Sequence, residues 1–385
     1  MARRRIPIGV ALLILLVLAP AATAGEPFRY PAAKHGKGEL RYLNGLPVLT
    51  VEGSPEELGD QIGFLALKPT KDLTQQVQEL LKAWHLEKAY PVLMTTAAFL
   101  GPRFPPDHLK ELEAAARVSG IDRNLLIFVN TLFDMQKLWG CSALLVEPER
   151  SATSSPLFGR NLDIPPFGHV YEYSFVTIYR PRGKHAFASI TLPGLFGCAS
   201  GMNEHGLAIA WLDVSSVRDG SPAFDPMGTP LVCCFRRVLE ECGTVEEAEK
   251  LIHSLKRTRA ANLAVCDRKG AAVLEITPKN VVVRRGSEGI CSCTNHFRSS
   301  LLAENLQCPR YEALERSRTL AKLTLADVAK HLHAANQGSA TLQTMIFEPA
   351  TLKVHLAFGK GPASALPLQT LELAPLFSAP RAEDH

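Results

Sequence analysis

The strongest constraint on the fold is a change of local pattern near residue 140. The segment 54–138 carries apolar residues at helical spacing, and it opens with a capping box in which Ser54 and Glu57 flank Pro55. Helices are expected from residue 54 onwards and over 71–90, 107–118 and 123–135. The front third of the chain is therefore predicted to be mostly helical.

Beyond residue 140, short apolar segments alternate with turns, a pattern typical of strands. The segments 267–270 and 348–351 are predicted to be hairpin turns. Strands are expected over 157–164, 173–179, 186–192, 207–213, 263–265, 272–276, 281–284, 341–347 and 353–358, and helices over 230–242, 245–256 and 325–336. This layout predicts an α+β protein, with a helical front segment joined to a body rich in antiparallel hairpins.

The first 24 residues have the pattern of an export signal. Arg3–Arg5 form a positive region, Ile6–Leu18 is almost wholly apolar, and Ala22–Ala24 is a small-residue cleavage box. An uncleaved membrane anchor is the alternative, but the apolar stretch is short for a span and Pro20 lies near its end. The sequence predicts a signal peptide over 1–24, a periplasmic or secreted protein, and no membrane association after cleavage.

The charge balance and the cysteine pattern limit which partners and cofactors are expected. The 42 basic and 38 acidic residues are too evenly balanced for a nucleic-acid-binding protein. Nine cysteines in an exported chain permit disulfides, but their pairing stays open. Cys291 and Cys293 with His296 form only a weak zinc pattern, so no metal and no cofactor are expected.

Four polar motifs carry the candidate chemistry. Arg160 and Asp163 are three residues apart, so on one regular strand they would face opposite sides, and only a bend after Asn161 would bring both to one pocket. Taken singly, the motifs are equally compatible with surface ion pairs, turns and caps. The motifs are Trp139–Ser142, Gly159–Asp163, Gly201–Leu207 and Thr294–Phe297.

In this order, the motifs resemble those of the acyl-CoA:6-aminopenicillanate (isopenicillin N) acyltransferase-like family of autoproteolytic cysteine N-terminal-nucleophile hydrolases. Penicillin V acylases and bile-salt hydrolases are more distantly similar. The resemblance extends over about residues 40–365, including 54–63 and 341–349. It implies a four-layer αββα fold and self-cleavage between Gly140 and Cys141. The segment 25–140 would then be a small, non-covalently retained chain, and 141–385 the catalytic chain.

The resemblance, together with the needs of acyl transfer, assigns roles to the candidate residues. Cys141 would be the nucleophile, with its own freed α-amino group as the base. Arg160 would stabilise the thiolate, and Asp163 would orient the α-amino group. Asn295 would donate a hydrogen bond to the oxyanion from its side-chain amide, and Asn203 would donate a second one from its main chain or its side chain.

A further cation is expected after Asn295 in the segment 314–320, which is predicted to be helical, and the family pattern favours Arg316 over Arg318. His296 offers an alternative base in a Cys–His dyad, but an N-terminal amine makes such a base unnecessary. The chain departs from the family at Ser142, where many members have Thr. Ser142 keeps a hydroxyl group, so the cleavage remains compatible with the sequence.

The leading functional hypothesis is an exported amidohydrolase that cleaves a linear amide, such as an N-acyl amino acid or a small peptide, through an acyl-cysteine. Acyl transfer to an amine uses the same intermediate and stays open. A non-catalytic binding protein is disfavoured by the intact set of polar residues, and a papain-like protease by the lack of its cysteine signature. The substrate and the oligomeric state, including a homo-oligomer, also stay open.

Overall fold

The computed structural model describes residues 27–71, 73, 90–135, 140–164, 169–214, 216–304 and 306–378. The signal peptide expected over 1–24 lies outside these residues, as does most of the helix expected over 71–90. Within the described ranges, no helix combines the length and apolarity that crossing a membrane requires.

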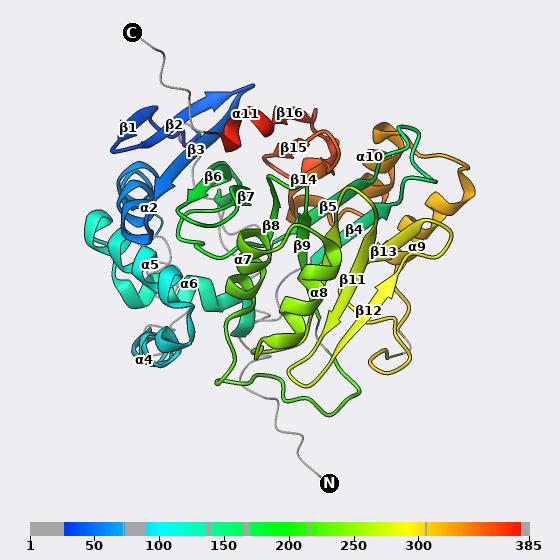
Figure 1. Cartoon of the computed structure of the whole chain (residues 1–385), viewed down its shortest axis with the longest axis horizontal. Coiled ribbons are helices and arrows are strands. Elements are labelled where there is room, and N and C mark those ends of the chain that lie inside the picture. Colours follow the sequence, from blue (N-terminus) through cyan, green and yellow to red (C-terminus); the bar gives the residue numbers. More distant parts are fainter. Residues whose placement is uncertain are drawn as a thin grey trace.

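Two β-sheets form the centre of the protein (Figure 1). The larger sheet has the order β1-β2-β3-β6-β7-β8-β9-β10-β11-β12, and the smaller has the order β13-β4-β5-β14-β15-β16. The strands of the larger sheet are β1 Ala33–His35, β2 Gly38–Leu43, β3 Leu46–Gly53, β6 Phe175–Pro181, β7 Phe187–Thr191, β8 Ser200–Asn203, β9 Ala208–Asp213, β10 Ala261–Cys266, β11 Ala271–Ile276 and β12 Val281–Arg285. Those of the smaller sheet are β4 Gly140–Val146, β5 Leu157–Asp163, β13 Ile290–Cys293, β14 Thr341–Glu348, β15 Lys353–Phe358 and β16 Gln369–Glu372.

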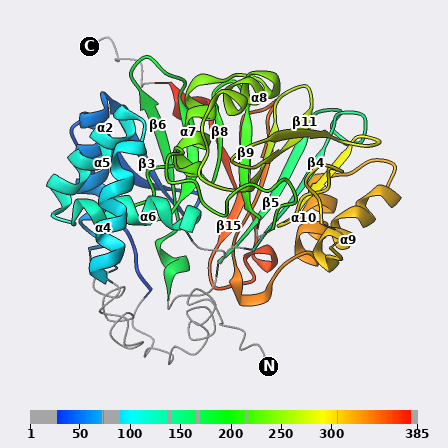
Figure 2. The ribbon, with the colours of Figure 1, turned by 90° about the horizontal axis from the view of Figure 1, so that it is seen from below.

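The sheets are stacked between two helical layers, which gives the four-layer αββα arrangement. β4 packs on β9, β10 and β11 of the larger sheet. Helices α7 (Leu231–Glu241) and α8 (Val245–Ser254) cover the larger sheet, while α9 (Pro309–Glu315) and α10 (Leu325–Ala334) cover the smaller one. Figure 2 shows these two helical layers on opposite sides of the strands.

Strand alternation in β4 separates the two cores of the smaller sheet. Cys141, Ala143 and Leu145 belong to the large core that includes the strands of both sheets. Leu144 and Val146 belong to the core shared with α9 and α10. The thiol of Cys141 therefore lies between the sheets, with no exposed surface.

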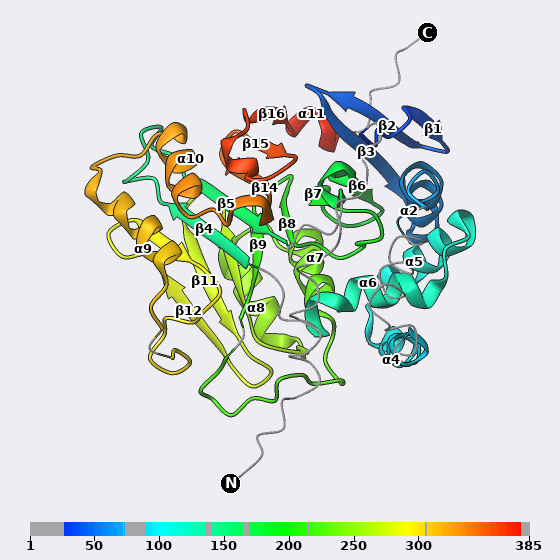
Figure 3. The ribbon, with the colours of Figure 1, turned by 180° about the vertical axis from the view of Figure 1, so that it is seen from behind.

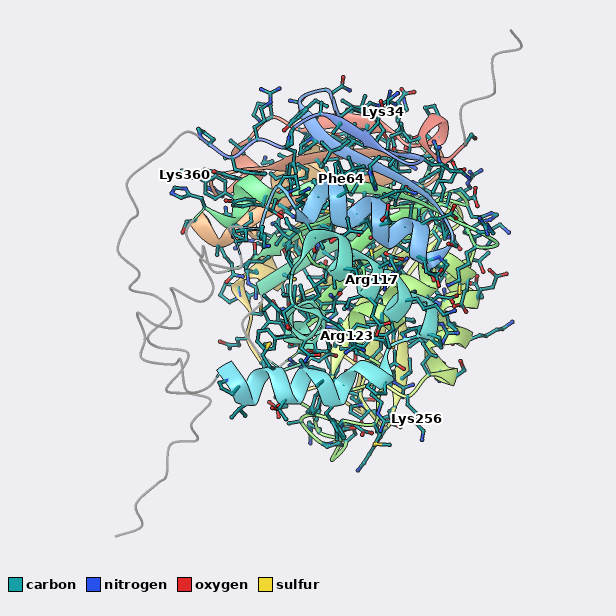
Figure 4. The ribbon with its side chains drawn as sticks, turned by 90° about the vertical axis from the view of Figure 1, so that its left-hand side faces the viewer. Lys34, Phe64, Arg117, Arg123, Lys256 and Lys360 are labelled. Atoms are coloured by element: carbon teal, nitrogen blue, oxygen red, sulfur yellow. The ribbon has the colours of Figure 1, made fainter. Side chains whose placement is uncertain are left out.

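The front segment does not stand apart from the body, because its first strands extend the larger sheet. β3 pairs in parallel with β6, with Val48 opposite Val176. Helices α2 (Pro55–Ile62), α4 (Tyr90–Leu100), α5 (Pro106–Ser119) and α6 (Arg123–Met135) follow. Figure 4 faces this helical side, on which Arg117 of α5 and Arg123 of α6 are labelled.

Helix α2 packs tightly on α5 at Gly59. A Cβ atom at that position would lie 2.0 Å from the backbone oxygen of Glu111, so only glycine permits this approach. The predicted start of α2 is confirmed, because the side chain of Ser54 accepts a hydrogen bond from the Glu57 amide and the Glu57 carboxylate accepts one from the Ser54 amide.

A buried polar network joins the front segment to the body. Arg236 of α7 donates to both carboxylate oxygens of Glu111 of α5, at 2.9 and 2.6 Å, and to Glu240 at 2.8 Å. His108 of α5 lies 3.0 Å from the Glu240 carboxylate. Burial raises the pKa of Glu240, but Arg236 and His108 outweigh it and hold that pKa well below its usual range. Through these buried hydrogen bonds, the packing of α5 and of α7 stabilises each helix against the other.

The α+β class and the predicted helices and hairpins of the body are confirmed, with boundaries shifted by a few residues. One element was misassigned. The polar segment 201–207 was expected to be a turn, but residues 200–203 form the strand β8, and only the following residues turn into β9. A four-residue strand with Gly201 and Asn203 has too little apolar alternation to be recognised from its sequence.

Candidate active site

The site forms where β4 begins, one strand in from the edge of the smaller sheet. β4 pairs antiparallel with β5 on one side, with Cys141 opposite Leu162, and with β13 on the other, with Ala143 opposite Cys293. Continuing this second register by two residues places Asn295 beside Cys141. Its Oδ1 atom accepts a hydrogen bond of 2.8 Å from the Cys141 amide.

Arg160 of β5 reaches the nucleophile candidate from within the core. Its Nη2 atom donates to the Cys141 sulfur at 3.3 Å and to the backbone oxygen of Trp211 at 2.9 Å. Its Nη1 atom donates to the Ser200 hydroxyl. The guanidinium group is fully buried, and within the described part of the chain it forms no ion pair with a carboxylate. Arg160 is therefore a buried cation without a carboxylate partner among the described residues. The Cys141 sulfur, once deprotonated, would supply the negative charge that balances it.

Asp163 lies on the other face of β5, as strand alternation predicts, and the bend after Asn161 does not occur. Its carboxylate accepts hydrogen bonds from Gln337 at 2.8 Å and from Thr341 at 2.6 Å. It sits opposite Gly140 in the sheet, where a Cβ atom would be 1.6 Å from Gln337 Nε2. Glycine before Cys141 thus leaves room for the bond between Gln337 and Asp163. Figure 3 shows α10 beside β5 and β4 on this side.

The cation near the main chain of Cys141 is Arg310, at the start of α9. Its Nη1 atom donates to the Cys141 carbonyl at 2.7 Å and lies 3.7 Å from Asp163 Oδ2. Its Nη2 atom donates to Asn295 Oδ1 at 2.9 Å. The Nδ2 atom of Asn295, the group expected to donate to the oxyanion, donates here to the backbone oxygen of Asp213 at 2.9 Å, and it is the Oδ1 atom that faces the Cys141 amide.

The expectation for Arg316 and Arg318 is corrected by this arrangement. Arg316 is exposed, and Arg318 pairs with Glu315 at 2.8 Å. The helix was expected around 314–320, whereas α9 begins at Pro309 and places Arg310 in its first turn. The Cys308-Pro309 pair is a helix-start signal that the sequence reasoning did not use.

Asn203 is also corrected, because the structure does not bring it to Cys141. Its Nδ2 atom donates to the backbone oxygens of Leu239 and Cys242, at 3.0 and 2.6 Å. Its Oδ1 atom accepts from the amides of His205 and Leu207. The Asn203 amide donates to the Leu207 oxygen at 3.0 Å, so both the main-chain and the side-chain donors of Asn203 are engaged within its own turn and at the end of α7.

His296 does not form a dyad with Cys141. Its Nδ1 atom lies 3.0 Å from the Thr294 hydroxyl, which is 3.6 Å from the sulfur of Cys308. In the described residues, Cys291, Cys293 and His296 form no group with metal-ligand spacing. The weak zinc pattern therefore has no geometric support.

The two thiols near the site differ in acidity. Burial raises the pKa of Cys141, and the opposing effect of Arg160 does not fully offset it. Partial burial also raises the pKa of Cys308, but hydrogen bonds from His296, the Tyr311 amide and Thr294 lower it to about 6. In the uncut chain, Cys308 is thus the more acidic thiol and carries the larger thiolate fraction at pH 7, a property that sequence reasoning did not detect.

This difference predicts an order of alkylation in the uncut chain. Iodoacetamide at pH 7 should modify Cys308 well before Cys141, since the thiolate is the reacting form. Lowering the pH through 6 should slow the reaction of Cys308, because its thiolate is protonated there. Peptide mass spectrometry after timed quenching measures both rates, with the fully buried Cys266 as an internal control. Faster modification of Cys141 would contradict this order.

Comparison with known proteins gives a family match over more than half of the chain. The model of the family described as acyl-coenzyme A:6-aminopenicillanic acid acyl-transferase matches residues 150–362, a stretch that begins after Cys141. An uncharacterized protein from Archaeoglobus fulgidus is 24% identical over 306 residues, which cover 71% of this chain and 51% of that protein. The chain thus spans about half the length of this curated relative.

Three solved structures are also similar to the chain. A conjugated bile acid hydrolase from Clostridium perfringens aligns with a TM-score of 0.41 and 15% identity, over 61% of this chain and 93% of that one. An N-acylethanolamine-hydrolyzing acid amidase ortholog from Caenorhabditis elegans aligns with a TM-score of 0.44 and 13% identity, over 60% of this chain and 100% of that one. A penicillin V acylase from Agrobacterium tumefaciens aligns with a TM-score of 0.39 and 14% identity, over 60% of this chain and 84% of that one.

Proposed function

The chain belongs to the acyl-coenzyme A:6-aminopenicillanic acid acyl-transferase family, and on that premise we propose that it is an exported cysteine amidohydrolase. It matures by cutting itself between Gly140 and Cys141. The mature enzyme then cleaves a linear amide, such as an N-acyl amino acid or a small peptide, through an acyl-cysteine. The signal-like segment over 1–24 supports export.

The pairing of Cys141 with Arg160 is the observation that carries the proposal. A buried guanidinium group without a carboxylate is costly unless an anion balances it. The Cys141 sulfur lies 3.3 Å from Nη2 and is the group that can become that anion. Burial raises the pKa of Cys141 and Arg160 opposes that effect, so the guanidinium group lowers the cost of forming the thiolate, which is the form of cysteine that attacks carbonyl carbon.

Maturation begins with the Cys141 thiol, at a stage when the α-amino group of Cys141 is still part of a peptide bond and cannot act as a base. The sulfur attacks the Gly140 carbonyl carbon, the bond from that carbon to the Cys141 nitrogen breaks, and the nitrogen takes up the thiol proton. Water then hydrolyses the resulting thioester, which releases the Gly140 carboxylate and restores the thiol. Arg310 and Asn295 hold the carbonyl and amide of Cys141, so the nucleophile is fixed on one side of the bond to be cut.

After the cut, the new α-amino group supplies the base. Its pKa in unperturbed peptides is about 7.7–8.0, so a substantial fraction is neutral near pH 7 and accepts the thiol proton. Asn295 Oδ1 already accepts a hydrogen bond from this nitrogen. Asp163, on the other face of β5, lies 3.7 Å from Arg310, which also donates to Asn295. The amino group then returns the proton to the leaving amine.

The front segment stays attached without a covalent link in this proposal. The pairing of β3 with β6 and the buried bonds between Glu111 and Arg236 both cross from 25–140 to 141–385. Asn130 of α6 adds bonds to the amides of Phe196 and Gly197, at 2.7 and 2.9 Å. The segment 25–140 is thus the protein's own retained partner chain.

Acyl transfer to an amine is the second candidate, because the matched family is described as an acyl-transferase. The acyl-cysteine is common to both reactions, and the acceptor decides between them. Export favours hydrolysis of an amide over transfer from coenzyme A, since coenzyme A thioesters, which would be the acyl donors, are scarce outside the cytoplasm.

Intact mass measurement of the purified protein tests maturation directly. Two chains are expected under denaturing conditions, and the larger should begin with Cys141. Assays with N-acyl amino acids, with and without an added amine, separate hydrolysis from transfer by their products. A single uncut chain with full amidase activity would falsify the proposal.

A further inference from the structure

A second cluster of reactive side chains lies at the turn between β8 and β9. His185 precedes β7, and Glu204 and His205 follow β8. Because β7 and β8 are neighbours, with Phe187 opposite Asn203, these ends of the strands meet. In the described ranges this is the one group of histidine, cysteine and carboxylate side chains whose ligand atoms all lie within 4.8 Å of one another. None of the residues that contact Cys141 belongs to it.

We infer that His185, Glu204 and His205 form a binding site for a divalent transition-metal ion, for which Zn²⁺ is the best-fitting ion. His185 Nδ1 lies 3.0 Å from His205 Nε2 and 3.6 Å from Glu204 Oε1. Tetrahedral zinc has bonds of about 2.0–2.1 Å to nitrogen and oxygen, so its ligand atoms are about 3.3 Å apart. The two observed separations lie on either side of that value.

The backbone fixes the three ligands independently of any ion. The Glu204 amide donates to the Ala186 oxygen at 2.9 Å, and the Ala186 amide donates to Glu204 Oε1 at 3.1 Å. The His185 amide donates to the Glu240 oxygen at 3.0 Å, and the His205 amide to Asn203 Oδ1 at 3.1 Å. The role of Asn203 in this turn is thus to hold the ligand-bearing segment.

The chemistry of the ligands selects the class of ion. Two imidazole nitrogens and one carboxylate suit zinc and its first-row neighbours, whereas magnesium and calcium prefer oxygen ligands alone. At 3.0 Å, the two imidazoles share a single proton between their facing nitrogens, and a divalent cation would replace it. Lys184, the nearest lysine in sequence, already pairs with Asp107 and Glu240.

The proposed ion would cross-link the loop before β7 to the loop after β8. His185 is one-third exposed and Glu204 two-fifths exposed, so water completes the coordination. A bound ion would link the connection before β7 to the turn after β8, which lie on neighbouring strands of the larger sheet. The expected consequence is a more stable larger sheet, with amide chemistry unchanged.

Calorimetric titration with Zn²⁺ alone tests the site, after accessible thiols have been blocked with iodoacetamide. The wild type should bind one equivalent, and its melting temperature should rise with zinc. Glu204→Gln and His205→Ala should each weaken binding by at least about tenfold, since even the loss of a supporting contact costs 10- to 100-fold. His253→Ala removes an exposed histidine on α8 and should bind as the wild type does.

Glu204→Gln keeps the shape of its side chain, so a loss of binding in that variant is not explained by misfolding. Co²⁺ as a second probe should give a tetrahedral spectrum without thiolate charge-transfer bands. Unchanged zinc binding in Glu204→Gln and His205→Ala, or no one-to-one binding by the wild type, would overturn the assignment.

Discussion

A Cys141→Ala variant is expected to remain one uncut chain and to lose at least about 10⁴-fold in amide hydrolysis, the order of loss seen when a nucleophile is removed from a set that acts together. The sulfur is the atom proposed to attack the Gly140 carbonyl and then the substrate. The substitution removes one buried atom and leaves Asn295 and Arg310 able to bind the main chain. Intact mass and turnover of an N-acyl amino acid measure the two effects.

Cys308→Ala is the matched control for this prediction. Cys308 has the more acidic thiol in the uncut chain, with a pKa of about 6, and lies close to Thr294. If acidity alone chose the nucleophile, this variant would be the inactive one. We expect Cys308→Ala to be cut and to turn over within a few-fold of the wild type. The reverse pattern, with Cys141→Ala active and Cys308→Ala inactive, would move the chemistry to Cys308.

An Arg236→Met variant is expected to lose about 3–5 kcal/mol of folding free energy, because breaking a buried ion pair leaves uncompensated charge. Arg236 is 1% exposed, and it is hydrogen-bonded to Glu111 and Glu240. Methionine fills much of the space but leaves Glu111 without its buried cation. Urea unfolding at pH 7 measures the loss. In processed protein, the front chain should also dissociate at lower urea concentration.

Arg237→Met provides the comparison on the same helix. Arg237 forms an i,i+4 pair with Glu241 at 2.6 Å, but both side chains are about one-third exposed. Exposed pairs contribute about 0–1 kcal/mol, so this variant should unfold near the wild-type midpoint. Equal destabilisation by the two substitutions would mean that the network between Glu111 and Arg236 does not hold the segments together.

The elements that the sequence predicts correctly are those whose pattern is local. The capping box of Ser54 and Glu57 needs only four consecutive residues, and the hairpin turn at 267–270 only two short flanking strands. The face alternation of Arg160 and Asp163 also follows from spacing alone, and the structure places them on opposite sides of β5. Each of these features depends on neighbours along the chain, so no knowledge of the fold is required.

The motifs around Cys141, Arg160, Asp163 and Asn295 come from three separate parts of the sequence, and their resemblance to one family was enough to group them. The family match over 150–362 includes Arg160, Asp163 and Asn295 but begins after Cys141. The contact between Asn295 and Cys141, however, depends on the register of β13 against β4. A shift of one residue in that register would turn the side chains to the other face.

The sequence by itself determined the α+β class, most of the body's helices and hairpins, and the motifs grouped around Cys141. Only the tertiary structure decided that Arg310 rather than Arg316 reaches the site, and that Asn203 serves its own turn. The start of α9 and the pairing of β8 between β7 and β9 set those two outcomes. The deciding contacts join Arg310 to Cys141, 169 residues apart, and Asn203 to Leu239, 36 residues apart. Such contacts follow from packing and strand register, which local residue patterns do not encode.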